Sequence, residues 1–154
     1  MTQPKAPDAP VTPGRTAYLI GRLDRALRHH LAATVGPLGL TVSQYTALSV
    51  LHSRGQLSNA RLAERSFMTP QAANELVKVM EGKRWVSRQP DPSHGRIVLI
   101  RLTSQGEKLL ARGDEAVARL EEALLRTLSH EDRATLCRTL KTCMCNLEAI
   151  LAEA

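Results

Sequence analysis

The sequence predicts a mainly α-helical protein, with about six helices and one two-stranded β-hairpin, on three observations. Apolar residues recur at three- and four-residue spacing through most of the chain, which is the spacing of amphipathic helices. Helix-capping residues and proline or glycine breaks divide this pattern into separate segments. Only two short segments are convincing strand candidates, and a loop rich in proline separates them.

The first 14 residues differ in composition from the rest of the chain. Residues 1–13 contain four prolines and almost no large apolar side chain, so they cannot bury enough surface to offset the entropy cost of ordering. We expect residues 1–14 to form a mobile arm. From about Arg15 an apolar stripe predicts the first helix, which should end at Gly36-Pro37 because proline lacks an amide proton and disfavours a helix in the residue before it.

Three capping signals predict the next three helices. Thr41 and Gln44 have the spacing of a capping box, and Pro70 is suited to a first helical turn, where the missing amide costs little. Only about three residues separate the last two of these helices, so they must turn sharply against one another, as in a helix-turn-helix. The predicted helices run from Thr41 to about Gly55, from Ser58 to about Ser66 and from Thr69 to about Gly82.

The two strand candidates follow directly. Residues 85–89 and 97–102 flank a loop of seven residues with two prolines and a glycine, which predicts a hairpin placed as a wing beside the helix-turn-helix. Thr103 and Ser129 then cap two long terminal helices with leucine-rich stripes. These helices and the first one cannot bury their stripes against so small a central module, so a second copy of the chain is the expected partner.

Basic charge is concentrated in the central region. Residues 41–103 carry nine Lys and Arg against four Asp and Glu, a net charge of +5, whereas residues 104–154 carry seven against nine. Neutralisation of phosphates supplies most non-specific affinity for nucleic acid. We therefore assign residues 41–103 to a winged helix-turn-helix DNA-binding module, and residues 15–40 and 104–154 to dimerisation helices.

Several classes of protein are not expected. The sequence has no apolar run of about 18 residues that would span a membrane and no signal-peptide pattern at its start, so we expect a cytoplasmic protein without a membrane partner. It has no glycine-rich phosphate loop, no G-x-S-x-G and no H-E-x-x-H motif, which argues against an enzyme. No His, Cys and carboxylate set has ligand spacing, so neither a metal nor another cofactor is expected.

Three stretches carry a more specific pattern. They are LTVSQYTALSVL from Leu40, LSNARLAERSFMTPQAANELVKVMEGKRWVSR from Leu57, and an arginine, Arg96, followed by five strand residues and Leu-Thr-x-x-Gly. With the order of helices from Arg15 onward, they resemble the MarR family of bacterial transcriptional regulators. The resemblance implies a homodimeric repressor that binds a pseudo-palindromic operator in double-stranded DNA and is released by a small aromatic or anionic effector.

Two positions depart from the pattern of that family. The family usually has an acidic residue two positions before the wing arginine, where this chain has His94. It usually has glycine-leucine before the wing strand, where this chain has Arg84-Trp85. We expect the wing loop to be held differently and Gly82 to shift the end of the preceding helix.

The fourth predicted helix carries side chains suited to reading bases. Gln71 and Asn74 can each bond adenine bidentately, Ala72 can contact a thymine methyl, and Glu75 can accept from cytosine. The inward face is expected to hold Leu76, Val77 and Met80. The predicted recognition residues are Thr69, Gln71, Ala72, Asn74, Glu75 and Lys78.

The wing and the element ends supply the other predicted DNA contacts. Arg96 resembles the wing arginine of the family, which implies insertion into the minor groove, where a narrow A/T tract concentrates negative potential. His94 can donate to a phosphate, more strongly when protonated, and Arg88 is the third predicted wing contact. Contacts to the DNA backbone, which position the module without reading sequence, are predicted for Arg54, Ser58, Arg61 and Lys83.

The effector cleft is predicted from the resemblance to the MarR family alone. Members of the family bind small aromatic or anionic effectors in a cleft, and polar or aromatic side chains of the first and second predicted helices are candidates to line it. The residues expected to line the cleft are Arg22, His29, His30 and Tyr45.

Cys137, Cys143 and Cys145 lie near the C-terminus. On a leucine-rich helix such residues are mostly small apolar core or interface positions, and that is the expectation here. Cys143 and Cys145 point in different directions on a helix and cannot readily bridge each other. Two alternative functions stay open: a thiol-based redox-responsive regulator that uses these cysteines, and a winged-helix module that binds protein.

Overall fold

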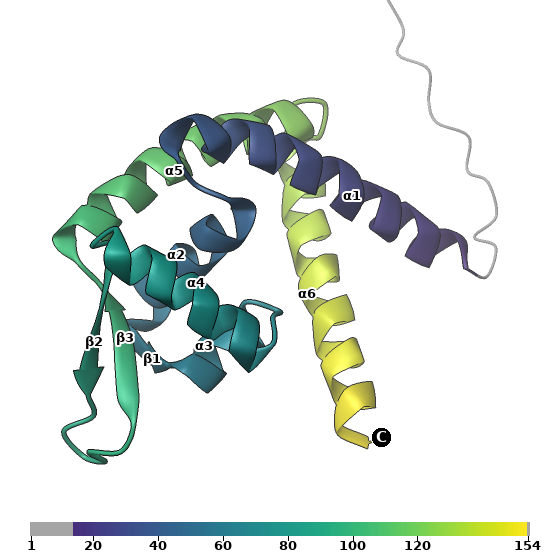
Figure 1. Ribbon diagram of the computed structural model, residues 1–154. Helices are drawn as coiled ribbons and strands as arrows, with labels where there is room; N and C mark the ends of the chain where they lie inside the picture. Colours follow the sequence, from purple (N-terminus) through teal and green to yellow (C-terminus); the bar gives the residue numbers. More distant parts are fainter. Residues whose placement is uncertain (1–13, 154) are drawn as a thin grey trace, which may run out of the picture. The chain divides into compact units, whose positions relative to one another are not determined.

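The computed structural model describes residues 14–153 (Figure 1). The expected mobile arm, residues 1–14, lies outside the described residues except for Gly14, the N-cap of the first helix. The described part contains six α-helices and three strands, which confirms the mainly α-helical class. The chain divides into two compact units, one ending at Val117 and one beginning at Ala118, and each is described by itself.

The first two helices have the predicted bounds. Helix α1 is Arg15–Val35, and a short 3-10 helix, Gly36–Leu38, follows at the predicted break. Helix α2 is Val42–Arg54. The predicted capping box is present, since the Thr41 hydroxyl accepts from the backbone N–H of Gln44 at 3.1 Å and the Gln44 side chain accepts from the backbone N–H of Thr41 at 2.9 Å. These two bonds use amides that a helix start otherwise leaves free.

The predicted helix-turn-helix is also present. It consists of α3, Asn59–Arg65, and α4, Pro70–Gly82. Ser58 and Thr69 cap these helices as expected, each accepting from a backbone N–H three residues ahead. The bounds of both helices are therefore set by local hydrogen bonds.

Two helices, α3 and α4, end with a non-glycine residue in the left-handed conformation, where glycine is usual. After α4, the N–H of Trp85 donates to the carbonyl of Met80 at 2.9 Å, and Arg84 at φ 62° lies in the left-handed region. This is a Schellman motif, in which glycine usually takes the left-handed position. Phe67, at φ 54°, has the same position after α3. At Arg84-Trp85 the chain thus keeps the turn but accepts backbone strain.

We expect Arg84→Gly to raise the free energy of unfolding by about 0.5–1 kcal/mol, because it removes left-handed strain that exceeds the added entropy cost of glycine. Arg84→Ala is the matched control: it removes the same charge but keeps a Cβ at positive φ, and it should give no gain. Urea unfolding followed by the fluorescence of Trp85, the one tryptophan in the sequence, measures both. Equal gains for the two variants would assign the effect to the lost side chain.

The sheet has three antiparallel strands in the order β1-β3-β2, one more than predicted. Strands β2, Val86–Pro90, and β3, Val98–Leu102, lie close to the predicted segments. The sequence analysis missed β1, Gln56–Ser58, in which Leu57 pairs with Ile100. Three residues are too few to show an alternating pattern, and β1 forms because β3 offers it a free edge.

The two long terminal helices begin after the predicted caps. Helix α5 is Ser104–Leu125 and helix α6 is His130–Glu153. The hydroxyls of Thr103 and Ser129 each accept from a backbone N–H three residues ahead, at 3.1 Å. Helix α5 begins in the first unit and ends in the second, and α6 lies wholly in the second.

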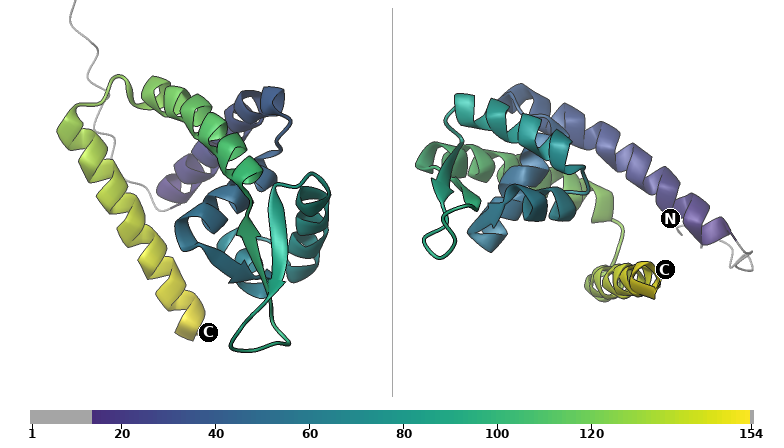
Figure 2. Two further views of the ribbon diagram at one scale, coloured as in Figure 1. Left: turned by 90° about the vertical axis from the view of Figure 1, so that its left-hand side faces the viewer. Right: turned by 60° about the horizontal axis from the view of Figure 1, so that its bottom comes forward.

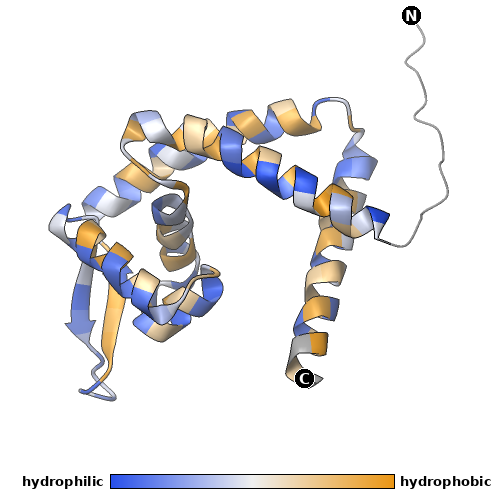
Figure 3. Ribbon diagram, turned by 45° about the vertical axis from the view of Figure 1, so that its right-hand side comes forward, coloured by the Kyte–Doolittle hydropathy of each residue, from blue (hydrophilic) through white to orange (hydrophobic). Residues whose placement is uncertain are grey.

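The core of the first unit is mainly aliphatic, in a sequence that has only four aromatic residues of the Phe, Tyr and Trp types. It joins the end of α1 to α2, α3, α4, the sheet and α5 as far as Val117 in one cluster, and Trp85 adds a residue that is 8% exposed. Figure 3 shows the contrast between the apolar β3 and the more polar β2. The largest fully buried side chains are Leu48, Leu51, Leu62, Met80, Leu110, Val35, Val77 and Val86.

Candidate nucleic-acid interface

The outer face of α4 is the candidate recognition surface. Burial of Ala73, Val77 and Met80 fixes which side of the helix packs on the core. Leu76, expected to face inward, is half-buried, and Val79 is 49% exposed. The helix therefore presents its polar side away from the core. The predicted residues Thr69, Gln71, Ala72, Glu75 and Lys78 are exposed, and Asn74 is half-buried.

Two of these side chains pair with each other. Lys78 Nζ lies 2.9 Å from Glu75 Oε1, and the two side chains are 55% and 64% exposed. Exposed pairs at this spacing stabilise a helix by only about 0.2–0.5 kcal/mol. Either side chain can therefore leave the pair for a base or a phosphate at little cost.

Asn59 is a positioning residue that the sequence analysis missed. From the first turn of α3, its Nδ2 donates to the carbonyl of Pro70 at 2.8 Å. That carbonyl belongs to the first residue of α4, so the bond fixes the start of the recognition helix against α3. No local sequence pattern predicts this hydrogen bond, because its two partners lie 11 residues apart in the sequence.

The wing loop is held by its own backbone and by Asp91. The N–H of Asp91 donates to the carbonyl of Ile97 at 2.7 Å, and the Asp91 carboxylate accepts from the N–H of Ser93 at 2.8 Å. An acidic residue thus stabilises this loop from five positions before Arg96. His94 and Arg96 are both exposed, and Figure 2 shows the loop extending beyond α2, α3 and α4.

The predicted backbone-contact residues lie near the ends of elements. Arg54 is exposed in the last turn of α2, and Ser58 is engaged as the cap of α3. Arg61 and Lys83 are exposed, whereas Arg88, which was predicted as a wing contact and lies within β2, is half-buried. These last three each have a partner: Arg61 Nη1 lies 3.0 Å from Glu64 Oε2, Lys83 Nζ lies 4.5 Å from the centre of the Trp85 ring, and Arg88 Nε lies 3.2 Å from Glu81 Oε2.

The Leu-Thr-x-x-Gly segment joins the wing, the recognition helix and α5. The Thr103 hydroxyl donates to the carbonyl of Arg84 at 2.6 Å and accepts from the N–H of Gly106 at 3.1 Å. The N–H of Thr103 donates to the carbonyl of Trp85 at 3.0 Å. Gly106 lies so close to Trp85 that an added Cβ would overlap that carbonyl oxygen. One threonine and one glycine therefore fix the junction where α4 ends and α5 begins.

The predicted effector residues lie on α1 and α2 of the first unit. Arg22, His29 and His30 are exposed on α1. Tyr45 is half-buried on α2, and its hydroxyl donates to Asp114 Oδ1 on α5 at 2.8 Å. Tyr45 thus anchors α2 to α5, and the grouping of the four residues into one cleft stays a prediction.

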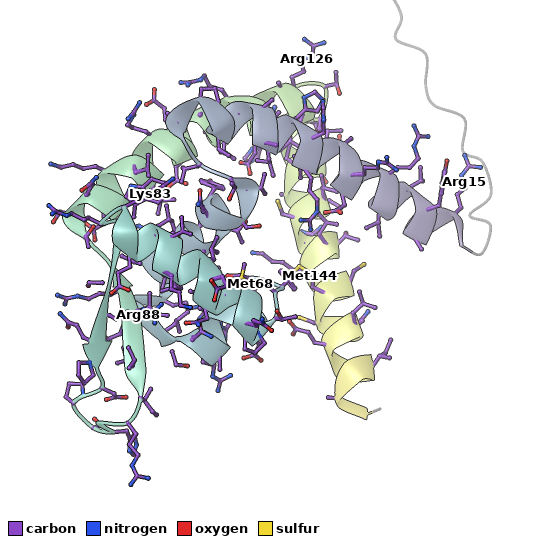
Figure 4. All side chains as sticks on the ribbon, viewed as in Figure 1. Arg15, Met68, Lys83, Arg88, Arg126 and Met144 are labelled. Atoms are coloured by element: carbon purple, nitrogen blue, oxygen red, sulfur yellow. The ribbon has the colours of Figure 1, made fainter. Side chains whose placement is uncertain are left out.

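The three cysteines lie on α6 and are exposed free thiols. The expectation of core positions within their own chain is therefore wrong, because α6 presents them to solvent; interface positions stay a prediction. The same helix exposes apolar side chains that follow one another every three or four residues, among them Met144 (Figure 4). They are Leu140, Met144, Leu147 and Ile150, at 41%, 53%, 62% and 62% exposed.

Residues 14–153 contain neither a metal-binding cluster nor a membrane-spanning helix. No group of three or more His, Cys, Asp or Glu side chains there is arranged to hold a metal ion. No helix in that part of the chain has both the length and the apolar character needed to cross a membrane.

Known proteins are similar to this chain in both sequence and fold. The sequence model of the MarR family matches residues 38–97, which include the helix-turn-helix and β2. The HTH-type transcriptional repressor Rv2887 of Mycobacterium tuberculosis is 36% identical over 118 residues, which are 77% of this chain and 81% of that repressor.

Solved structures agree with this similarity. The wild-type MarR of E. coli in its apo form has a TM-score of 0.73 and 25% identity, and the match covers 86% of this chain and 96% of that one. The transcriptional repressor CouR, solved on a 23-mer DNA duplex, has a TM-score of 0.76 and 23% identity, with 88% and 99% covered. The CouR match shows the shared fold alone.

Proposed function

The chain belongs to the MarR family, and from this premise we infer that it is a DNA-binding transcriptional regulator and not an enzyme. The observation that carries the inference is the arrangement of α3, α4 and the β2-β3 hairpin, which presents an exposed polar helix face and an exposed arginine at the wing tip. The relative Rv2887 is a transcriptional repressor, and we propose repression for this chain.

In the proposed complex, α4 lies in the major groove and the wing reaches the adjacent minor groove. Gln71 and Asn74 read base edges, and Arg96 enters the minor groove with His94 beside it on a phosphate. The exposed cations at the element ends neutralise further phosphates. These are Arg54, Arg61 and Lys83, with the remaining polar positions of α4 at the edges of the groove.

The proposed regulator is a homodimer formed by residues 15–40 and 104–154, with residues 41–103 as the DNA-binding module. Helices α1 and α6 both expose apolar side chains, and a second copy would bury them at a gain of about 25 cal/mol per Å². A two-fold dimer presents two recognition helices to successive major grooves, which requires a pseudo-palindromic operator. The exposed apolar residues of α1 are Tyr18, Leu19, Ile20 and Leu23, at 63%, 51%, 47% and 46%.

We further propose that a small aromatic or anionic effector releases the repressor in the cytoplasm. A ligand bound beside Arg22, His29, His30 and Tyr45 would change the separation of the two recognition helices by favouring one conformation of the dimer. The contact of Tyr45 with Asp114 supports this, because it links α2 of the DNA-binding module to α5.

Selection of bound duplexes from a random pool tests the proposal. A dimer should enrich a pseudo-palindrome whose half-sites are centred about one helical turn apart, roughly 10–10.5 base pairs. Sedimentation of the same sample gives its oligomeric state. A pool without enrichment in dilute salt, or a protein that sediments as a single subunit, would contradict the proposal.

We expect Gln71→Ala to weaken binding to the selected duplex about fivefold to tenfold and to leave binding to random duplex unchanged, because a bidentate base contact is worth about 1–3 kcal/mol of discrimination. Gln105→Ala, an exposed glutamine on α5, is the matched control and should change neither affinity. Competition between the two duplexes gives the ratio directly. An equal loss on both duplexes would reassign Gln71 to the DNA backbone.

A further inference from the structure

One ion pair spans the junction between the recognition helix and the wing. Arg88 Nε lies 3.2 Å from Glu81 Oε2. Glu81 belongs to the last turn of α4. Arg88, labelled in Figure 4, stands in the middle of β2 and pairs with Ile100 of β3. Only residues 83–85 connect the two elements. The ion pair is therefore a second link between α4 and β2, in addition to residues 83–85 of the chain.

The guanidinium of Arg88 faces the protein. Its side chain is 29% exposed, and its Nε and Nη2 atoms are buried. Neither atom makes a hydrogen bond among the described residues, so the contact of Nε with Glu81 is an ion pair without hydrogen-bond geometry. A phosphate contact requires N–H groups that the phosphate can reach. Two of the three guanidinium nitrogens are thus closed to DNA, whereas Arg54 and Arg96 are exposed.

The Glu81 pair also differs from the other ion pairs of the DNA-binding module. Arg61 with Glu64 and Lys78 with Glu75 are i,i+3 pairs within one helix, and all four of those side chains are more than half exposed. Such pairs brace a single helix. Arg88 and Glu81 come from two different elements, and the arginine is the most buried side chain of the three pairs.

We propose that Arg88 is a positioning residue that acts with Glu81 to hold the wing at a fixed angle to the recognition helix. This rests on the proposed function, because it assigns the pair a role in binding DNA. The wing and α4 must engage neighbouring grooves at the same time, and a hinge that is already fixed loses less entropy on binding. Removal of either partner leaves the other without its opposite charge and frees the hinge.

The test is a double-mutant cycle of E81Q and R88Q, measured as affinity for the selected duplex over a series of salt concentrations. Each single variant should weaken binding by about threefold to tenfold, and the double variant should be no weaker than either single. The slope of log affinity against log salt should stay at the wild-type value, since no phosphate contact is lost. R88K, which keeps the charge, should recover part of the loss.

Other outcomes overturn the positioning role. A phosphate contact predicts that R88Q lowers the salt slope by about one while E81Q tightens binding. A purely structural pair predicts lower stability in urea with unchanged affinity of the folded protein. E64Q, which breaks the exposed pair with Arg61 within α3, should not weaken binding. If the wild-type protein binds no duplex, the proposed function fails and this role with it. If the wild-type protein binds and both E81Q and R88Q bind as tightly as it does, this role alone fails.

Discussion

Replacing Gly106 by alanine is expected to lower the free energy of unfolding by about 3 kcal/mol or more, since it forces a methyl group into occupied space. The added Cβ would overlap the carbonyl oxygen of Trp85, a backbone atom that cannot rotate away. That oxygen also accepts from the N–H of Thr103. Relief of the overlap must separate α5 from the start of the wing and break the bonds that Thr103 makes.

Gly82→Ala is the matched control for this prediction. Gly82 lies in the last turn of α4, and a Cβ there would meet no atom within 4 Å. Alanine should therefore be neutral or raise stability by about 0.4–1 kcal/mol. Urea unfolding at one fixed protein concentration compares the variants, because dimer stability depends on concentration. A Gly106→Ala protein within 1 kcal/mol of the Gly82→Ala protein would contradict the close approach.

The helices were predictable because their signals are local. Each cap, such as Thr41 with Gln44 or Thr69 before Pro70, satisfies amides within three residues and needs no knowledge of the tertiary fold. Strand β1 was not predictable for the opposite reason. Its partner residues lie about 40 positions further along the chain, and three residues carry no periodicity of their own.

The two non-glycine residues with a left-handed backbone could not be predicted, because neither residue type favours that conformation. Arginine and phenylalanine disfavour positive φ, yet Arg84 and Phe67 adopt it. At Arg84 the burial of Trp85 accounts for this, because the Schellman turn lets Trp85 join the same core cluster as Met80. Tertiary packing thus outweighs a local preference of about 1–2 kcal/mol.

The candidate interface shows the same division. The helical period identified which side of α4 faces away from the core, and it placed Gln71 and Lys78 correctly on the exposed side. It did not reveal the bond from Asn59 to Pro70 or the pair of Arg88 with Glu81, since each joins separate elements. Charge patterning predicts which region binds a nucleic acid, but only tertiary contacts separate side chains that can face DNA from side chains that hold the module in shape.

The same distinction can be tested at the tip of the wing. We expect Arg96→Ala to weaken binding to every duplex about tenfold to a hundredfold. Arg96 is exposed on a loop that Asp91 and Ile97 close, so it can enter a narrow minor groove with little change of backbone. Loss of one cation on DNA should also reduce the salt slope by about one. Arg101→Ala removes the same charge from an exposed site on β3, away from the tip. If both variants lose the same affinity, net charge alone explains the effect; a loss confined to Arg96→Ala requires an arginine placed at the tip of the wing.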